Sequence, residues 1–280
     1  MIWIITGAIA VFLFLWLLYG YSMNFFLKKE TYTVESSAVS KPFKAVLLAD
    51  LHSASFGKKN EKLIRMIDKE SPDLILVAGD MVVKNAKNLS VTKEFLAAVS
   101  KHYPIYYSPG NHEIRMPDYE GYKTFLKSLG ITYLENESIY LPDYDLTVTG
   151  LDLPEYYYHK CWQKRTFTKE TMDKLVGLNT KKGCQLLLAH NPEYIPLYRQ
   201  WGADVTCSGH LHGGIMILPC LGGVLSPSLR LFPRYDQGLF KEEGAFHIIS
   251  RGLGLHHLKF RFFNTPELSV INFTCTKSSN

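Results

Sequence analysis

The chain has 280 residues, of which 46% are hydrophobic and 20% are charged, and its formal net charge is +5. This length and apolar content suffice for one substantial core and do not demand a second domain. The 31 basic residues form no run of like charge long enough to serve as a nucleic-acid-binding arm. The five cysteines lack C-x-x-C spacing, so they indicate neither a zinc ribbon nor a disulfide framework.

The first 27 residues carry no charged side chain, and the stretch from Ile2 to Tyr19 is apolar except for Thr6. A helix of this length can cross the ~30 Å hydrocarbon core of a bilayer. Since neither a basic start nor a small-residue cleavage site marks a secretory signal, we predict a retained, single-pass transmembrane anchor over residues 1–27. Lys28 and Lys29 follow it at once, which by the positive-inside rule favours a cytoplasmic placement of the rest of the chain.

Residues 28–42 are rich in Ser, Thr and charge, and we predict that they form a linker to a domain over residues 43–280. Within this domain, short apolar runs typical of buried strands each end at a carboxylate, amide or imidazole side chain. These are 43–49 before Asp50 and His52, 74–79 before Asp80, 105–110 before Asn111 and His112, 186–189 before His190, and 203–209 before His210 and His212. Ligands gather at the carboxyl ends of strands in α/β sheets, so we expect one site.

Helical spacing of apolar residues predicts helices over 59–70, 92–102, 118–129 and 192–201, and further strands are predicted over 146–151, 245–250 and 267–273. This alternation indicates an α/β fold. An aromatic and basic insertion over residues 153–167 is equally compatible with a cover over the site and with a packed surface loop.

The polar residues at the strand ends are suited to binding metal ions. Asp50 and His52 lie two residues apart in an extended segment, which projects both side chains to one face, and the same holds for His210 and His212. Asp80 adds a second carboxylate, which can bridge two cations. Oxygen and nitrogen donors without a thiolate are typical of a pair of borderline divalent ions rather than of structural zinc or an iron–sulfur cluster.

The ordered set D-x-H, G-D, G-N-H-E, an apolar strand ending in His, and G-H-x-H-G-G resembles the calcineurin-like metallophosphoesterase family. The resemblance begins near residue 43, and the tail over 250–254 and 261–267 is similar to the membrane-anchored or exported bacterial branch. It implies a sandwich of two mixed β-sheets flanked by helices, here preceded by one N-terminal transmembrane helix. It also implies two divalent ions, the first held by Asp50, His52, Asp80 and His212 and the second by Asp80, Asn111, His190 and His210.

In this family a hydroxide shared by the two ions attacks the phosphoester, and the resemblance implies that His112 donates a hydrogen bond or a proton to the departing oxygen. Members that orient this histidine with a carboxylate carry it three residues after the bridging aspartate, where this chain has Val83. We therefore expect a backbone carbonyl, or another acid such as Glu113, to orient His112.

These observations predict a membrane-anchored two-metal phosphohydrolase that cleaves a phosphodiester or a pyrophosphate. A lipid-linked substrate suits the anchor. Ligand hardness favours manganese, although iron, cobalt and zinc tolerate the same donors. The alternatives are a non-catalytic interaction scaffold of the same fold, which loss of metal ligands would mark, and a nuclease. We expect no nucleic-acid partner, since the sequence shows no stripe of basic and aromatic residues that could bind phosphates and stack on bases.

The remaining residues are expected to have surface or packing roles. Five histidines outside the motifs are interpreted as surface or packing residues, namely His102, His159, His247, His256 and His257. Lys84 and Lys87 are interpreted as part of a solvated loop. The apolar stretch from Ile215 to Leu225 could hold an acyl chain beside the site, but core packing explains it more simply.

Overall fold

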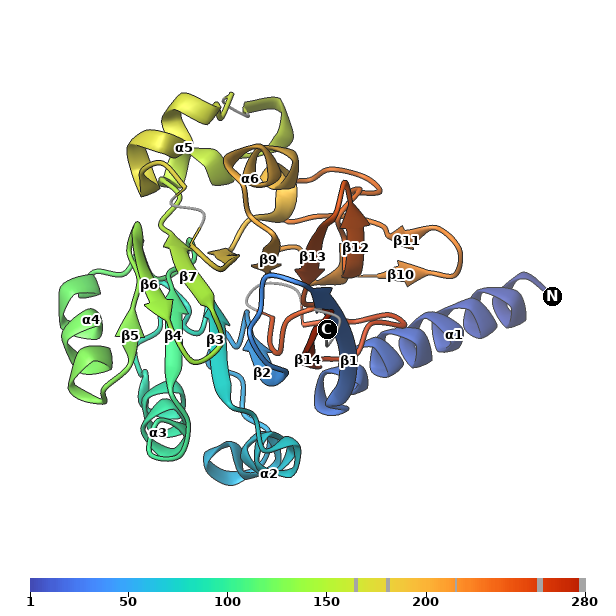
Figure 1. Ribbon diagram of the computed structural model, residues 1–280. Coiled ribbons are helices and arrows are strands. Elements are labelled where there is room, and N and C mark those ends of the chain that lie inside the picture. The colour runs from blue at the N-terminus through green and yellow to red at the C-terminus, as the bar shows by residue number, and fades with distance from the viewer. Residues whose placement is uncertain (164–165, 180–181, 215, 256–258, 277–280) are drawn as a thin grey trace.

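The computed structural model describes residues 1–163, 166–179, 182–214, 216–255 and 259–276. Two six-stranded sheets form its centre (Figure 1). The first has the order β1 (Lys28–Ser36), β14 (Glu267–Cys275), β2 (Phe43–Leu48), β3 (Leu74–Ala78), β4 (Ile105–Ser108) and β5 (Thr132–Tyr133). The second has the order β12 (Gly238–Glu242), β13 (Ala245–Ile249), β9 (Val205–Ser208), β8 (Cys184–Ala189), β7 (Leu146–Leu151) and β6 (Glu137–Leu141).

Both sheets are mixed. β14 pairs antiparallel with β2, whereas β2 to β5 are parallel, and β7, β8, β9 and β13 are parallel between antiparallel edge strands β6 and β12. One buried cluster joins the two sheets face to face, with Leu47 and Leu76 from the first and Leu186 and Val205 from the second. The predicted sandwich of two mixed sheets is therefore confirmed.

Helices cover the outer face of each sheet. The first sheet packs against α2 (Glu61–Glu70), α3 (Ser90–Val99) and α4 (Tyr119–Ser128), and the second against α5 (Lys169–Val176) and α6 (Ile195–Trp201). Short 3₁₀ turns are η1 (Met23–Phe25), η2 (Lys58–Asn60), η3 (Glu155–Tyr158), η4 (Cys161–Gln163), η5 (Pro192–Tyr194) and η6 (His212–Gly214), and β10 (Ile217–Leu218) pairs with β11 (Gly222–Gly223) in a hairpin.

The prediction of a linker over residues 28–42 is wrong for residues 28–36, which form β1. This strand pairs in parallel with β14 along its whole length, from Lys28 opposite Glu267 to Ser36 opposite Cys275. The segment contains alternating Thr, Tyr and Val residues, which favour an edge strand with one half-buried face. The structure thus joins the end of the N-terminal helix directly to the first sheet.

The N-terminal helix α1 (Ile2–Ser22) projects from the domain (Figure 1). The apolar segment Ile2–Phe25 has 24 residues, a mean hydropathy of 2.4 and no buried residue in its most apolar window, so its length and composition fit a membrane span. The last turns of α1 contact the domain: Trp16 stacks on Phe262 with ring centroids 5.0 Å apart, and the Arg261 N–H donates to the Gly20 carbonyl at 2.9 Å. The helix is therefore fixed to the loop that precedes β14.

Candidate metal centre

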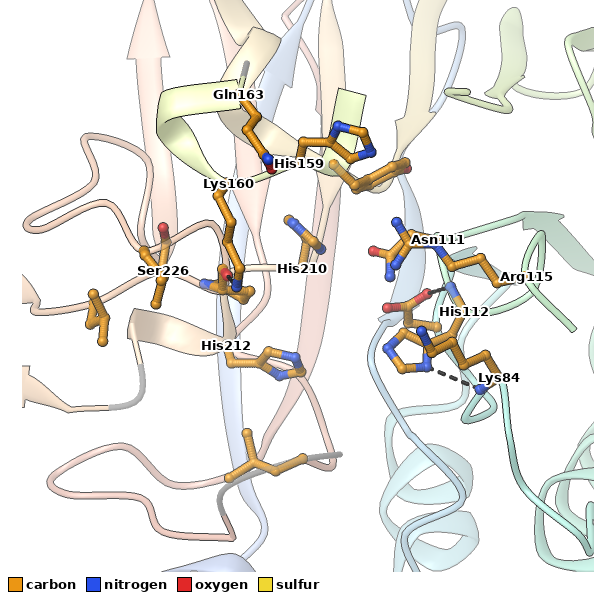
Figure 2. Close-up of a pocket in the computed structure, with 16 residues that line it drawn as sticks. Lys84, Asn111, His112, Arg115, His159, Lys160, Gln163, His210, His212 and Ser226 are labelled. Carbon is orange, nitrogen blue, oxygen red and sulfur yellow. Dashed lines mark hydrogen bonds between the residues drawn. The ribbon is translucent and has the colours of Figure 1, made fainter. Parts of the chain in front are cut away.

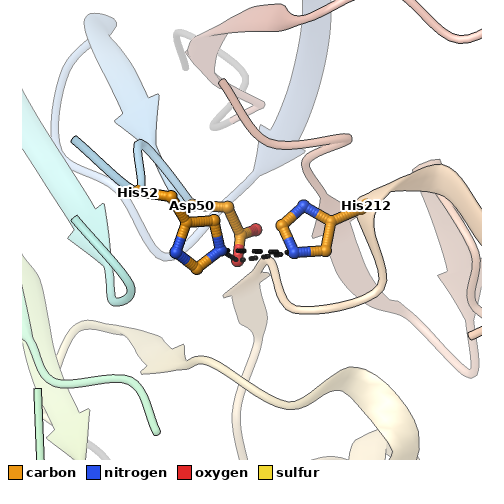
Figure 3. Close-up of side chains that lie close together, drawn as sticks. All are labelled: Asp50, His52 and His212. Atoms are coloured by element: carbon orange, nitrogen blue, oxygen red, sulfur yellow. Dashed lines mark hydrogen bonds and ion pairs between the residues drawn. The ribbon is translucent and has the colours of Figure 1, made fainter. Parts of the chain in front are cut away.

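The eight predicted site residues come from strand ends of both sheets, and all of them are buried. Three groups of them place their ligand atoms within 4.8 Å of one another. The groups are Asp50 with His52 and His212 (Figure 3), Asp80 with His190 and His210, and Asp80 with His52 and His112. The structure thus brings the strand-end motifs into one place.

The backbone around these residues is strained. Positive φ angles occur at Asp50 (52°), His52 (46°), Asp80 (55°), His210 (70°) and His212 (51°). Non-glycine residues rarely adopt this left-handed conformation, which costs free energy and is found mainly at functional sites. The surrounding sheets hold the site residues in a conformation that a free loop would not keep.

Two glycines allow the loops after β3 and β4 to touch. A Cβ on Gly79 would collide with the backbone of Gly110, and a Cβ on Gly110 would lie 2.7 Å from the Asp80 backbone nitrogen. Gly79 also has a φ of +77°. The G-D and G-N motifs therefore contain glycine because the backbones that carry Asp80 and Asn111 approach too closely for a side chain.

Each oxygen of the Asp50 carboxylate has a different role. Oδ2 accepts a hydrogen bond from the backbone N–H of His210 at 2.9 Å. Oδ1 lies 3.7 Å from Nε2 of His52, His190 and His212, and it accepts no hydrogen bond from the described residues. These distances are too long for hydrogen bonds. The distances to His52 and His212 suit ligands of a shared cation, since donors about 2.1 Å from one ion lie roughly 3 to 4 Å from each other.

Asp80 lies between the two ligand groups. Its Oδ1 accepts a hydrogen bond from the backbone N–H of His112 at 2.7 Å, while Oδ2 lies 3.1 Å from Nε2 of His190 and 4.0 Å from Nε2 of His52. Asn111 adds a buried side-chain oxygen that accepts no hydrogen bond from the described residues. Buried acceptors without donors are unfavourable, and a cation would satisfy both Asn111 Oδ1 and Asp50 Oδ1.

Backbone carbonyls fix the imidazole tautomers. Nδ1 of His190 lies 2.6 Å from the Ala78 carbonyl, and Nδ1 of His52 lies 3.3 Å from the Val82 carbonyl. A carbonyl only accepts, so each Nδ1 carries hydrogen, and Nε2 of each ring faces the site, where its lone pair would bind a cation once its proton is displaced. Nε2 of His52 is also 3.3 Å from Nε2 of His212, as expected for two ligands of one ion.

The charges at the site fit divalent ions as well. Burial raises the pKa of the Asp50 carboxyl to about 7, with the nearby Asp80 carboxylate acting in the same direction. For His190, burial lowers the pKa, but the Asp80 and Asp50 carboxylates outweigh it and raise the value to about 10. The metal-free site therefore holds protons near neutral pH, and bound cations would replace them.

His112 is oriented by a backbone amide. Its Nδ1 accepts a hydrogen bond from the Lys84 N–H at 3.1 Å, drawn as a dashed line in Figure 2. The partner of Nδ1 is therefore neither a carbonyl nor Glu113, contrary to the expectation from sequence. Because Nδ1 accepts, the hydrogen of the neutral ring is on Nε2.

Glu113 has a different role, which sequence reasoning missed. Its carboxylate accepts hydrogen bonds from the N–H groups of Asp80 (2.8 Å), Met81 (2.7 Å) and Gly110 (3.0 Å) and from the Tyr107 hydroxyl (2.7 Å). It thereby joins the loop after β3 to the loop after β4. Glu113 is the last residue of the G-N-H-E motif, and this position was the sequence signal for its role.

A cavity of about 450 Å³ opens over the site. The site residues Asp80, Asn111, His112, His210 and His212 line it, and so do Lys84, Arg115, Tyr158, His159, Lys160 and Gln163. Figure 2 labels most of these side chains. Part of the insertion over 153–167 therefore covers the site. His159 is exposed, as expected for a surface residue, and it also lines the cavity; Lys84 is half-buried and lines the cavity as well.

Two other histidines have the surface or packing roles expected of them: His102 is exposed and His247 is fully buried in β13. His256 and His257 lie outside the described residues. The apolar stretch after residue 215 was expected to pack in the core. Instead it forms the β10–β11 hairpin, and its last residue, Leu225, lines the cavity.

The loop before β14 supports His212, which sequence reasoning also missed. The Asn264 side-chain amide donates to the His212 carbonyl at 2.6 Å. The buried Arg261 guanidinium donates to the carbonyls of Gly252 (3.1 Å) and Gly254 (2.9 Å), and the Cβ that Gly252 lacks would lie 3.2 Å from Nδ1 of His212. The loop that receives α1 therefore also shapes the metal centre.

The fold and this donor set define a metal-binding hydrolase built on an α/β sandwich. The family model described as calcineurin-like phosphoesterase matches residues 43–214, and the chain belongs to this family. It is a metal-dependent phosphoester hydrolase, and its site binds divalent metal.

Three relatives by sequence carry metallophosphoesterase or phosphodiesterase names. An uncharacterized metallophosphoesterase of Aquifex aeolicus is 28% identical, covering 90% of this chain and 94% of the relative. Phosphodiesterase YaeI of Escherichia coli is 29% identical, covering 82% of each chain. A transmembrane protein with metallophosphoesterase domain of Danio rerio is 26% identical over 81% of this chain and 52% of the relative. A 5'-nucleotidase precursor from Thermus thermophilus superposes with a TM-score of 0.49 at 17% identity, over 76% of this chain and 49% of that one.

Proposed function

We propose that the protein is a membrane-anchored two-metal phosphohydrolase that cleaves a phosphodiester or a pyrophosphate. The observation that carries this proposal is the position of Asp80, whose Oδ2 lies between His190 of one ligand group and His52 of the other. One ion would be held by Asp50, His52, Asp80 and His212, and the other by Asp80, Asn111, His190 and His210. Manganese suits the ligand hardness best.

Divalent ions in these positions supply Lewis-acid stabilisation of phosphoryl oxygens and a nucleophile derived from water near neutral pH. The chain positions the substrate above them. His112 lines the cavity, and its Nε2–H donates a hydrogen bond to the phosphoryl or leaving oxygen. Burial lowers the pKa of His112, and the Lys84 N–H occupies Nδ1, so the ring acts as a neutral donor.

A neutral donor stabilises a leaving oxygen without transferring a full proton to it. This arrangement favours leaving groups that are already weakly basic, such as a phosphate released from a pyrophosphate, over simple alkoxides. The cavity adds cationic side chains around the site, among them Lys84, Arg115 and Lys160. These cations favour substrates with more than one anionic group.

Leu225, Leu229 and Leu255 also line the cavity and make part of its wall apolar. An amphipathic phosphoester, with an anionic head over the metal centre and an apolar tail against this wall, fits both surfaces. We therefore propose a lipid-linked substrate. The anchor α1 would hold the enzyme at the membrane that contains it, with the catalytic domain in the cytoplasm, as the charges of Lys28 and Lys29 favour.

The test is a substrate comparison with the full chain in detergent micelles and added manganese. Bis(p-nitrophenyl) phosphate, a dialkyl pyrophosphate and an alkyl phosphomonoester would be offered at equal concentration. We expect kcat/KM for the first two to exceed that for the monoester by about tenfold or more. Preference for the monoester would contradict the proposed substrate class.

A further inference from the structure

Large apolar side chains are exposed around the β10–β11 hairpin and the segment that follows it. These side chains, here called the hairpin patch, are Leu221 (64% exposed), Leu229 (42%), Leu231 (64%), Phe232 (50%) and Phe263 (52%). Contiguous apolar surface on a folded domain marks an interaction site.

Backbone hydrogen bonds make the hairpin patch one structural unit. Phe232 N–H donates to the Val224 carbonyl at 2.9 Å, and Leu225 and Leu231 form an antiparallel bridge, so the segment after the hairpin runs beside it. The Ile217 N–H donates to the Phe262 carbonyl at 3.0 Å, which joins the hairpin to the loop that carries Phe263.

The same loop carries the contact with α1. Phe262 stacks on Trp16, and the Phe263 ring lies 5.9 Å from the rings of both Trp16 and Tyr19. Figure 1 shows the hairpin and α1 projecting from the same side of the domain. The loop that carries Phe262 and Phe263 therefore links the hairpin to α1.

We propose that the hairpin patch rests in the interfacial layer of the bilayer that contains α1. This inference rests on the membrane anchoring proposed above. Trp and Tyr side chains near the end of a membrane helix lie at headgroup level, so Trp16 and Tyr19 place the neighbouring Phe263 at that level too. Arg230 and Arg234 lie beside the patch with partly exposed side chains, paired with Glu193 at 3.9 Å and with Glu242 at 2.9 Å, and their remaining N–H groups suit anionic headgroups.

The position of the patch deepens the proposed substrate class. Leu229 belongs to the patch and also lines the cavity, together with Leu225 from the same segment. The apolar wall of the cavity is thus continuous with the surface that faces lipid. A phosphoester with an acyl chain reaches the metal centre along this wall while its tail remains in the bilayer.

The exposed Cys220 at the hairpin tip provides a probe. The full chain, with Cys161 and Cys275 changed to Ser, would be labelled at Cys220 with an environment-sensitive fluorophore and reconstituted into vesicles of phosphatidylcholine and phosphatidylglycerol. We expect lipids with a shallow nitroxide to quench most of the fluorescence and aqueous iodide to quench little, because interfacial elements lie about 5–10 Å below the headgroup boundary. The matched control carries Lys127→Cys on α4 with Cys220→Ser and should show the reverse.

A second variant tests whether the patch itself causes insertion. The double variant Leu231→Asp with Phe232→Asp, labelled at Cys220, should lose most of the nitroxide quenching. Retained quenching would mean that α1 alone sets the depth of the hairpin in the bilayer, and would overturn the proposal.

Protection of Cys220 from both quenchers would show that a second copy of the chain covers the patch, and would overturn the proposal as well. Flotation of the labelled protein with the vesicles reports anchoring separately: failure to float refutes the anchor, and flotation with an iodide-accessible Cys220 refutes only the patch.

Discussion

The backbone N–H of Lys84 donates a hydrogen bond to Nδ1 of His112 at 3.1 Å, and this contact sets the tautomer of the residue proposed to touch the leaving oxygen. A backbone donor cannot take up a proton or shift with pH, unlike the carboxylate that orients this histidine in other members of the family. The Nε2–H of His112 is therefore held toward the cavity as long as the loop after β3 keeps its shape.

His112→Ala should lower kcat by about 10²-fold or more while metal content stays unchanged, because the side chain donates to the substrate and the ligands remain. The loss should be larger for poor leaving groups than for p-nitrophenolate. Single-turnover kinetics with a series of leaving groups, with elemental analysis of each preparation, provides the measurement.

Lys84→Ala is the matched control for that change. It retains the backbone N–H that orients His112 and removes only the side chain that lines the cavity. We expect KM to rise while kcat stays within about threefold of the original value. A kcat as low as that of His112→Ala would show that the Lys84 side chain, and not its backbone, is what His112 requires.

Glu113→Gln should loosen the metal centre without removing a ligand. An amide cannot accept all four hydrogen bonds that the carboxylate receives, so the loops that carry Asp80 and Asn111 lose their shared support. By analogy with groups that position metal ligands, we expect metal affinity to fall by about 10- to 100-fold. Competition with a chelator measures this affinity, and Glu137→Gln, on the exposed part of β6, should leave it unchanged.

His247 predicts a pH dependence of stability. Burial lowers its pKa from 6.5 to about 4, and neither ring nitrogen has a hydrogen-bond partner among the described residues. As pH falls below 6.5, the unfolded chain binds a proton at His247 while the folded protein does not. The free energy of unfolding is therefore highest above pH 6.5 and falls as pH decreases from 6.5 towards 4. Between pH 7 and pH 5 the free energy of unfolding should fall by about 1–2 kcal/mol more for the original chain than for His247→Gln. Equal pH slopes in chemical unfolding of the two proteins would contradict the assignment.

The strand-end residues of the site could be predicted from sequence because each motif is local. Asp50 with His52, and His210 with His212, lie two residues apart after an apolar run, and the order of such runs is readable without a structure. The partners of these residues could not be predicted in the same way. The amide of Lys84 and the carboxylate of Glu113 act through hydrogen bonds across 28 to 33 residues, and no periodicity encodes such contacts.

The same distinction applies to the fold. The strands that bear ligands were predicted because they are continuously apolar, as buried parallel strands are. β1 was mistaken for a linker because it lies at a sheet edge, with polar and charged side chains on its exposed face, and its partner β14 begins more than 200 residues later. For a similar reason the sequence did not decide whether residues 153–167 cover the cavity. An irregular insertion has no hydrophobic periodicity from which to infer where its side chains point.

Metal content most directly tests the claim that Asp80 is shared by two ions. The full chain and its Asp80→Asn variant would each be stripped with chelator, loaded with manganese, freed of excess metal and analysed for metal per chain, with activity measured on the same samples. We expect two ions per original chain, at most one per variant chain and loss of most activity in the variant. One ion or none in the original chain after loading, or two ions and full activity in the variant, would contradict this claim.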